Sequence, residues 1–190
     1  MLTHSRAKAL VDELPGVNAV ESLFLRGVSD HETGYGGGWK PEKVKQWYGK
    51  PIAWRPGVTA PWNMGAITTL HPNELSFSHQ DSQFDPKEGH VVQYVTWFAG
   101  DPTPELGFAR LRDTALKPNV RAALENNDFM LGIIGMYENG YFRGLHTHEL
   151  VTGDRDNIKD YYAKVAQCIV SIGQATGEVQ PDVLSPKAAR

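Results

Sequence analysis

A glutamate followed by a glycine-rich segment is the feature of this sequence with the clearest chemical meaning. Glu32 lies where an apolar helical pattern ends, and it begins the run Glu32-Thr33-Gly34-Tyr35-Gly36, soon followed by Trp39. Partial burial against a helix raises the pKa of a carboxyl group, and a general acid needs a raised pKa to keep its proton near neutral pH. The glycines would let a substrate come close. The alternative interpretation is an ordinary helix C-terminus followed by a flexible turn.

The helix that would position Glu32 has one apolar face. Pro15-Gly16 interrupts the chain before it, and Asn18 is suited to cap it. Glu32 lies four residues after Val28, so a helix that continues this far places the carboxylate on the buried face. We therefore expect an acid at the edge of the core, at the floor of a cleft. The residues of the apolar face are Val17, Val20, Phe24, Leu25 and Val28.

Length and composition indicate one globular domain. The chain has 190 residues, of which 41% are hydrophobic and 22% charged, and this is sufficient for a substantial core. The formal net charge of -3 gives no reason to expect binding to nucleic acid or to an anionic membrane. No stretch approaches the length of a transmembrane helix. We expect a catalytic domain over residues 1–175 and a polar C-terminal tail over residues 176–190.

The pattern along the chain predicts an α+β domain that is mainly α. Residues 1–33 have the periodicity of two helices, and residues 34–63 are a long loop region rich in Gly, Pro and Trp. Strand patterns over residues 66–97 predict a hairpin with a turn-rich tip at 81–89. From Pro104 onward the pattern is helical. This order favours a lysozyme-like domain with a small β-hairpin lobe beside the cleft, which at this level is an analogy of fold.

Two further groups contain residue types that can take part in catalysis or metal binding, but a structural role explains them better. Cys168 is the only cysteine and lies in an apolar helical segment, which indicates a buried small side chain and not a nucleophile. His146, His148 and Glu149 are residue types that bind zinc, but they lack the spacing of a known zinc motif and a defined third ligand. We expect that segment to be a surface loop, or an extension of a substrate groove, and we expect no metal and no cofactor.

Five short motifs occur in the order in which a known enzyme family has them. They are Glu32-Thr33-Gly34-Tyr35-Gly36, Asn63-Met64-Gly65-Ala66, Val91-Val92-Gln93-Tyr94, Asn139-Gly140-Tyr141-Phe142 and Tyr162-Ala163-Lys164-Val165. With these motifs, residues 17–173 resemble the glucosaminidase domains of glycoside hydrolase family 73, which include the peptidoglycan-hydrolase domain of flagellar rod-assembly proteins. Two features depart from the family pattern. The separation between Tyr141 and Tyr162 is longer, and the second-carboxylate motif of the hairpin is not recognisable.

The resemblance implies a peptidoglycan hydrolase. The expected activity is that of an endo-β-N-acetylglucosaminidase, which cleaves the β-1,4 glycosidic bond of the glycan strand with Glu32 as general acid and Tyr141 in the active site. A muramidase or a lytic transglycosylase on the same fold is an alternative, and a lytic transglycosylase needs only one acid/base glutamate. An alternative of another class is a non-catalytic glycan-binding or structural component of a phage virion or an injection machine.

The second catalytic group is left open by the sequence. Glycosidases use a second carboxylate to activate water or to act as nucleophile, while substrate-assisted enzymes use the acetamido group of the substrate instead. Asp81 is our preferred second carboxylate, because it lies nearest the position that the resemblance implies. The other candidates on the hairpin are Glu74, Asp85 and Glu88.

Four residues are candidates for binding the glycan. Tyr35 and Trp39 would stack on sugar faces, Asn63 would hydrogen-bond sugar or instead cap a turn, and Tyr137 would complete the set. The first 14 residues contain no hydrophobic run of a signal peptide. We therefore expect delivery to the cell wall, in the periplasm or outside the cell, by phage lysis, by a virion or by a secretion machine. The expected partner is the peptidoglycan glycan strand.

Overall fold

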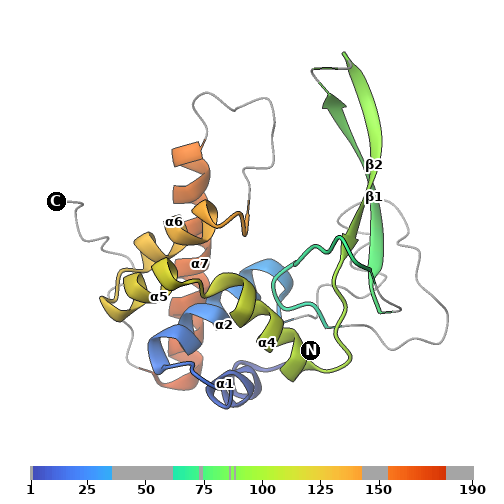
Figure 1. The fold of residues 1–190 in the computed structure, drawn as a ribbon. Helices are drawn as coiled ribbons and strands as arrows, with labels where there is room; N and C mark the ends of the chain where they lie inside the picture. The colour runs from blue at the N-terminus through green and yellow to red at the C-terminus, as the bar shows by residue number, and fades with distance from the viewer. Residues whose placement is uncertain are drawn as a thin grey trace.

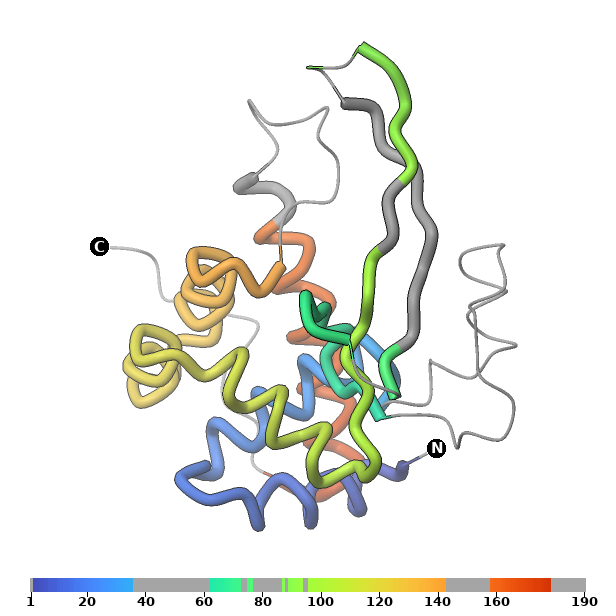
Figure 2. The backbone as a smooth tube through the Cα atoms, turned by 45° about the vertical axis from the view of Figure 1, so that its right-hand side comes forward, coloured from blue at the N-terminus to red at the C-terminus, as the bar shows by residue number. Residues whose placement is uncertain are grey.

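Helices dominate the computed structural model of the chain (Figure 1). The structure describes residues 2–35, 62–72, 75–85, 87, 89–142 and 154–178, and the statements below concern these residues. Six helices and two strands lie in these parts of the chain, and the hairpin projects away from the helices (Figures 1 and 2). The elements are α1 (His4–Asp12), α2 (Ala19–Thr33), β1 (Phe77–Asp85), β2 (His90–Phe98), α4 (Pro104–Ala115), α5 (Pro118–Glu125), α6 (Phe129–Glu138) and α7 (Asp154–Thr176).

The ends of α2 are defined by local side-chain and backbone chemistry. The Asn18 side chain accepts hydrogen bonds from the backbone N–H groups of Val20 and Glu21, both at 3.0 Å. The Glu21 carboxylate accepts one from the Asn18 backbone N–H at 3.0 Å, which completes a capping box. At the other end, Gly34 has φ 55° and ψ 48°, a left-handed conformation that terminates the helix one residue after Thr33. The predicted cap at Asn18 is confirmed.

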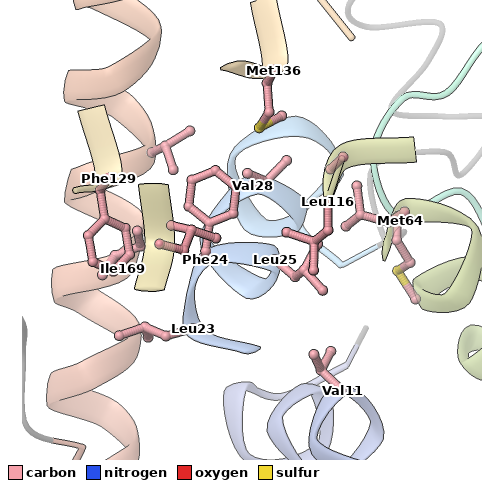
Figure 3. Close-up of a cluster of buried hydrophobic side chains, with 14 of the residues drawn as sticks. Val11, Leu23, Phe24, Leu25, Val28, Met64, Leu116, Phe129, Met136 and Ile169 are labelled. Atoms are coloured by element: carbon pink, nitrogen blue, oxygen red, sulfur yellow. The ribbon is translucent and has the colours of Figure 1, made fainter. Parts of the chain in front are cut away.

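The core surrounds α2. Phe24, Leu25 and Val28 are completely buried, as the apolar pattern predicted, and side chains from the other helices surround them (Figure 3). The helix α7 packs along α2, and Gly27 lies at this contact, where a β-carbon would overlap the Ile169 side chain. The absence of a side chain at residue 27 therefore allows the two helices to approach closely. This contact brings the C-terminal end of α2, with Glu32, beside α7.

The chain just after α7 is joined to α2 by an ion pair between the buried Arg26 and the partly buried Glu178. Arg26 is completely buried, and its Nη1 and Nη2 atoms donate to the Glu178 carboxylate at 2.8 and 2.7 Å. Residues 176–178, which we had assigned to the tail, are therefore held against the helical body, and residues 179–190 lie outside the described part of the chain. No helix in the described ranges is both long and apolar enough to span a membrane.

The two strands pair antiparallel in a register that runs from Phe77 opposite Phe98 to Asp85 opposite His90. Residues 81–85, which we expected in the turn, belong to β1, so the connection is shorter than predicted. Polar residues were mistaken for a turn because strand pairing uses backbone groups and tolerates polar side chains. At the start of the range 66–97, where we expected strands, residues 66–70 make only an isolated bridge, between Thr68 and Phe98.

Candidate active site at the end of α2

Glu32 lies in the last turn of α2 and faces α7. Its side chain is partly buried, and its Oε1 atom accepts a hydrogen bond of 2.6 Å from the Tyr161 hydroxyl. Burial raises the pKa of the Glu32 carboxyl, and the hydrogen bond from Tyr161 offsets only part of this effect. Glu32 therefore keeps its proton to a higher pH than a free glutamate does. The expected position of Glu32 at the edge of the core is confirmed, while the expected cleft and the catalytic role stay predictions.

Tyr161 is a member of this site that the sequence analysis missed. Its ring stacks on the Phe142 ring, with the centroids 4.1 Å apart and the planes inclined by 11°. The His31 ring meets it edge-on from α2, with the centroids 5.0 Å apart. A signal for Tyr161 exists in the sequence, because it lies four residues before Val165, which belongs to the buried face of α7.

His31 adds little positive charge beside Glu32 near neutral pH. Burial lowers the pKa of the His31 imidazole, and the nearby Lys164 lowers it further, while Asp160 and Asp30 act in the opposite direction. The imidazole is therefore neutral over more of the pH range than a free histidine is. The raised pKa of Glu32 therefore has burial as its cause, and the phenol of Tyr161 acts against it.

Tyr141 belongs to the same group of residues. Its hydroxyl donates a hydrogen bond of 2.9 Å to the backbone carbonyl of Gly65. Burial raises the pKa of the Tyr141 phenol far above its usual value, and the negative charge of Glu32 contributes to the increase. The two side chains are therefore close enough to interact electrostatically. Because the single hydroxyl proton of Tyr141 is donated to Gly65, its oxygen presents lone pairs to other groups.

Asn63 has a structural function, and the expectation that it binds sugar is wrong. It is 1% exposed, and its Nδ2 atom donates to the carbonyls of Ile67 and Ala99 at 3.0 and 2.9 Å. Its Oδ1 atom accepts from the backbone N–H groups of Gly65 and Ile67 at 3.3 and 2.9 Å. The bonds to residues 65 and 67 hold this turn together, including the carbonyl that Tyr141 contacts, and the bond to Ala99 ties it to the segment that follows β2. The capping alternative for Asn63 is the better interpretation.

Tyr35 packs into the core and does not offer a face for sugar stacking, contrary to expectation. It is 2% exposed, its hydroxyl lies 2.9 Å from His4 Nδ1, and its ring packs on Phe108. Its positive φ of 57° is uncommon for a residue with a side chain. After the left-handed Gly34, this conformation turns the chain so that the Tyr35 ring enters the core.

The remaining candidates are only partly covered by the structure. Tyr137 is partly buried, and its ring lies 5.6 Å from Phe142, so it joins the site through that ring. Trp39 lies outside the described residues, and of Asp81 only the backbone, within β1, is described. Of the other hairpin carboxylates, Asp85 is described by its backbone alone, and Glu74 and Glu88 lie outside the described residues.

The other two groups considered in the sequence have different outcomes. Burial raises the pKa of the Cys168 thiol to about 12, with a further contribution from Asp30, so the thiol is poorly reactive. The segment with His146, His148 and Glu149 lies outside the described residues. Within the parts of the chain that are described, no group of three or more His, Cys, Asp or Glu side chains is arranged to hold a metal ion.

Comparison with known proteins identifies no relative: no family model, no curated protein and no solved structure matches the chain. The chemistry of the site is therefore the guide to the function. Its chemistry is that of a proton donor, because a carboxyl group with a raised pKa is held by one phenol and lies near a second. Such an arrangement suits the protonation of a leaving group.

Proposed function

We propose that the protein is a glycosidase that acts on the glycan strand of peptidoglycan, with Glu32 as general acid. The observation that carries the proposal is the Glu32 carboxyl at the end of α2, with a raised pKa and a phenol donating to one of its oxygens. Glycosidic cleavage requires a proton for the leaving oxygen, and a carboxylic acid with a raised pKa can supply it near neutral pH.

The substrate class and the finer fold assignment come from the sequence motifs. The run that begins at Glu32 and the motif that contains Tyr141 are far apart in the chain, and in the folded protein the two side chains interact electrostatically. This proximity supports the resemblance to the family 73 glucosaminidase domains, in which both motifs are placed in the active site. A lysozyme-like arrangement, with the hairpin as a lobe beside the substrate, is part of the same proposal.

The bond that is cut is proposed to be the β-1,4 bond on the glucosaminidase side. A lytic transglycosylase is the second candidate, because it needs one acid/base glutamate and the side chains that shift the Glu32 pKa within the described residues include no second carboxylate. Asp81 remains the proposed second carboxylate for a hydrolase. The proposed place of action is the cell wall, reached by way of a phage, a virion or a secretion machine.

Digestion of purified peptidoglycan tests the proposal. Wild-type protein and Glu32→Gln are incubated with peptidoglycan, and the new glycan ends are identified by mass spectrometry. Reducing N-acetylglucosamine ends, formed by the wild type and not by the variant, are the expected result. Reducing N-acetylmuramic acid ends would mean a muramidase, and anhydro-muramic acid ends a lytic transglycosylase.

Two outcomes would contradict the enzymatic proposal. Equal activity of the folded Glu32→Gln variant would exclude Glu32 as the general acid. If neither protein produces new ends from a substrate that lysozyme digests, the chain is not this enzyme. Co-sedimentation of both proteins with the peptidoglycan in that case would instead support a glycan-binding or structural component.

A further inference from the structure

The two oxygens of the Glu32 carboxyl group have different surroundings. Oε1 accepts the hydrogen bond from Tyr161, and a phenol has only one proton to donate. The Tyr161 proton lies in the 2.6 Å contact between the hydroxyl and Oε1, and a second proton on Oε1 would point toward it. When Glu32 is protonated, its own proton therefore belongs on Oε2.

The direction of the Tyr161 hydroxyl is fixed by two rings. Phe142 stacks parallel to Tyr161 at 4.1 Å, and the edge-on His31 ring lies at 5.0 Å with an interplanar angle of 82°. The Tyr161 ring is therefore restrained both by Phe142, from the segment after α6, and by His31 from α2. A donor held in this way does not have to reorient when charge develops on Glu32.

We propose that Tyr161 is the positioning residue for Glu32, holding Oε1 so that Oε2 carries and delivers the proton, and that Phe142 keeps Tyr161 in place. This inference rests on the function proposed above. It assigns a role to a tyrosine on α7 that lies outside the sequence motifs, and to Phe142, which is part of a motif but was given no role. Tyr161 acts only through Glu32 and is not required to touch the substrate.

The proton transfer can be written for glycoside hydrolysis. The proton moves from Glu32 Oε2 to the glycosidic oxygen, and the bond from that oxygen to the anomeric carbon breaks, with its electron pair remaining on the oxygen. Water supplies the new oxygen on the anomeric carbon, and its released proton restores Glu32. As Glu32 becomes a carboxylate, the bond from Tyr161 becomes charge-assisted and stronger. The hydroxyl thereby stabilises the charge that forms in the transition state.

Removal of the Tyr161 hydroxyl should change the titration of Glu32 in a known direction. Burial raises the pKa of Glu32, and the bond from Tyr161 is the contribution in the described structure that lowers it. Without the hydroxyl, the pKa should rise further. Among the described residues, the other titratable or charged groups around this site are Asp30 and His31 on α2, Asp160, Lys164 and Cys168 on α7, and Tyr141 after α6.

The test measures Glu32 directly and does not require activity. Protein labelled with ¹³C at the glutamate side-chain carboxyl is titrated by NMR, and the Glu32 resonance is identified by its loss in Glu32→Gln. In Tyr161→Phe the titration midpoint of Glu32 should move to higher pH. The matched control is Tyr162→Phe, which removes a hydroxyl from the next residue of α7, one that does not contribute to the Glu32 pKa. Its midpoint should equal that of the wild type.

Phe142→Leu provides an independent variant, because it keeps the hydroxyl and removes the stacked ring. Its Glu32 midpoint should move in the same direction as in Tyr161→Phe, but less. A Glu32 midpoint in folded Tyr161→Phe that is unchanged or lower than in the wild type would overturn the proposal. Thermal unfolding of each variant shows that the measurement is made on folded protein.

The pH dependence of glycan cleavage then separates a positioning role from a structural one. Tyr161→Phe should lose about ten- to a hundredfold in kcat, and the basic limb of its pH–rate profile should move to higher pH. A loss of rate with an unmoved limb would overturn the proposal. If the NMR midpoint moves as expected but the wild type cleaves no glycan, the proposed function fails, while the control of Glu32 by Tyr161 stands.

Discussion

The Tyr141 hydroxyl and the Gly65 backbone are in direct contact, with the hydroxyl donating to the Gly65 carbonyl over 2.9 Å. A β-carbon on residue 65 would overlap this hydroxyl and would lie 2.6 Å from Leu111 Cδ1. The Gly65 carbonyl thus accepts a hydrogen bond from Tyr141, and the neighbouring side chains leave no room for a side chain at residue 65. The position of a proposed active-site phenol is set by a glycine from a distant part of the chain.

We expect Gly65→Ala to lower the free energy of unfolding by about 1–3 kcal/mol, because an added methyl group in a packed site forces its neighbours to move. Urea denaturation measures this loss. In a double-mutant cycle, Tyr141→Phe should relieve part of the clash, so that the double variant is more stable than the sum of the single losses predicts. Additive losses would show that the overlap with the hydroxyl is not the cause.

We expect Glu32→Gln to be more stable than the wild type at neutral pH. The pKa of Glu32 is raised on folding, chiefly by burial, so the folded state binds its proton more tightly than the unfolded state. The stability that this provides is complete below the unfolded pKa, near 4.5, and is lost as pH rises through the folded value. Thermal unfolding from about pH 3 to 8 should show the advantage of the variant growing with pH.

Glu125→Gln on α5 is the control for this experiment, since it removes one negative charge from an exposed position. The difference between the Glu32 and Glu125 variants isolates the effect of burial. A Glu32→Gln variant that is less stable than the wild type at pH 7 would contradict the prediction. A gain in stability together with a loss of cleavage would show that Glu32 serves function although it destabilises the folded protein.

We expect Glu178→Gln to lower the free energy of unfolding by about 1–3 kcal/mol, because it removes a carboxylate that pairs with the completely buried Arg26 guanidinium. Chemical denaturation at pH 7 measures the loss. Lys164→Ala, which breaks the exposed pair with Asp160 at 2.6 Å, is the control and should cost less than about 1 kcal/mol. Similar losses in the two variants would contradict the importance of burial.

The same ion pair predicts sensitivity to acid. Burial acts to raise the pKa of Glu178, but the hydrogen bonds from Arg26 and Thr176 outweigh it and lower the pKa to about 2. A lowered pKa gives stability that is present above the unfolded value of 4.5 and is lost as pH falls through the folded value. The wild type should lose stability between these pH values, and Glu178→Gln should lose less.

We expect Gly27→Ala to destabilise the protein, although alanine is the better helix former by about 1 kcal/mol. A β-carbon at residue 27 would overlap the Ile169 side chain where α2 and α7 cross. Ile169→Ala removes the overlapping atoms, so the Gly27 substitution should be less harmful in that background. Thermal unfolding of the four proteins in this cycle checks the prediction. A stabilising Gly27→Ala in the wild-type background would contradict it.

The sequence predicted best what depends on neighbours in the chain. The apolar face of α2 and its Asn18 cap follow from spacing within about fifteen residues, and both are confirmed. The burial of Tyr35 was not predicted, because it depends on a positive φ after Gly34 that a pattern of residue types does not reveal. Polar composition likewise suggested a turn where β1 in fact continues.

The residues of the site were likewise predicted from local features, and contacts between distant parts of the chain were missed. Glu32 was found because its helix and its glycines are local features, and Tyr141 was found through a motif. The partner of Glu32, Tyr161, was missed because the two residues are 129 positions apart, and only the packing of α7 on α2 joins them. Asn63 was misjudged because a residue type does not reveal whether the side chain turns inward, where it bonds residues 65 and 67 and the distant carbonyl of Ala99.

The pairing of Arg26 with Glu178 also has a consequence for folding during synthesis. These residues are 152 positions apart, and α2 leaves the ribosome long before α7 exists. Until α7 is made, the face of α2 around Gly27 lacks its covering helix, Arg26 lacks its counter-charge, and Glu32 lacks its phenol. The nascent chain therefore presents an incomplete apolar surface, which favours contacts with chaperones. One late helix therefore completes both the core around α2 and the surroundings of Glu32.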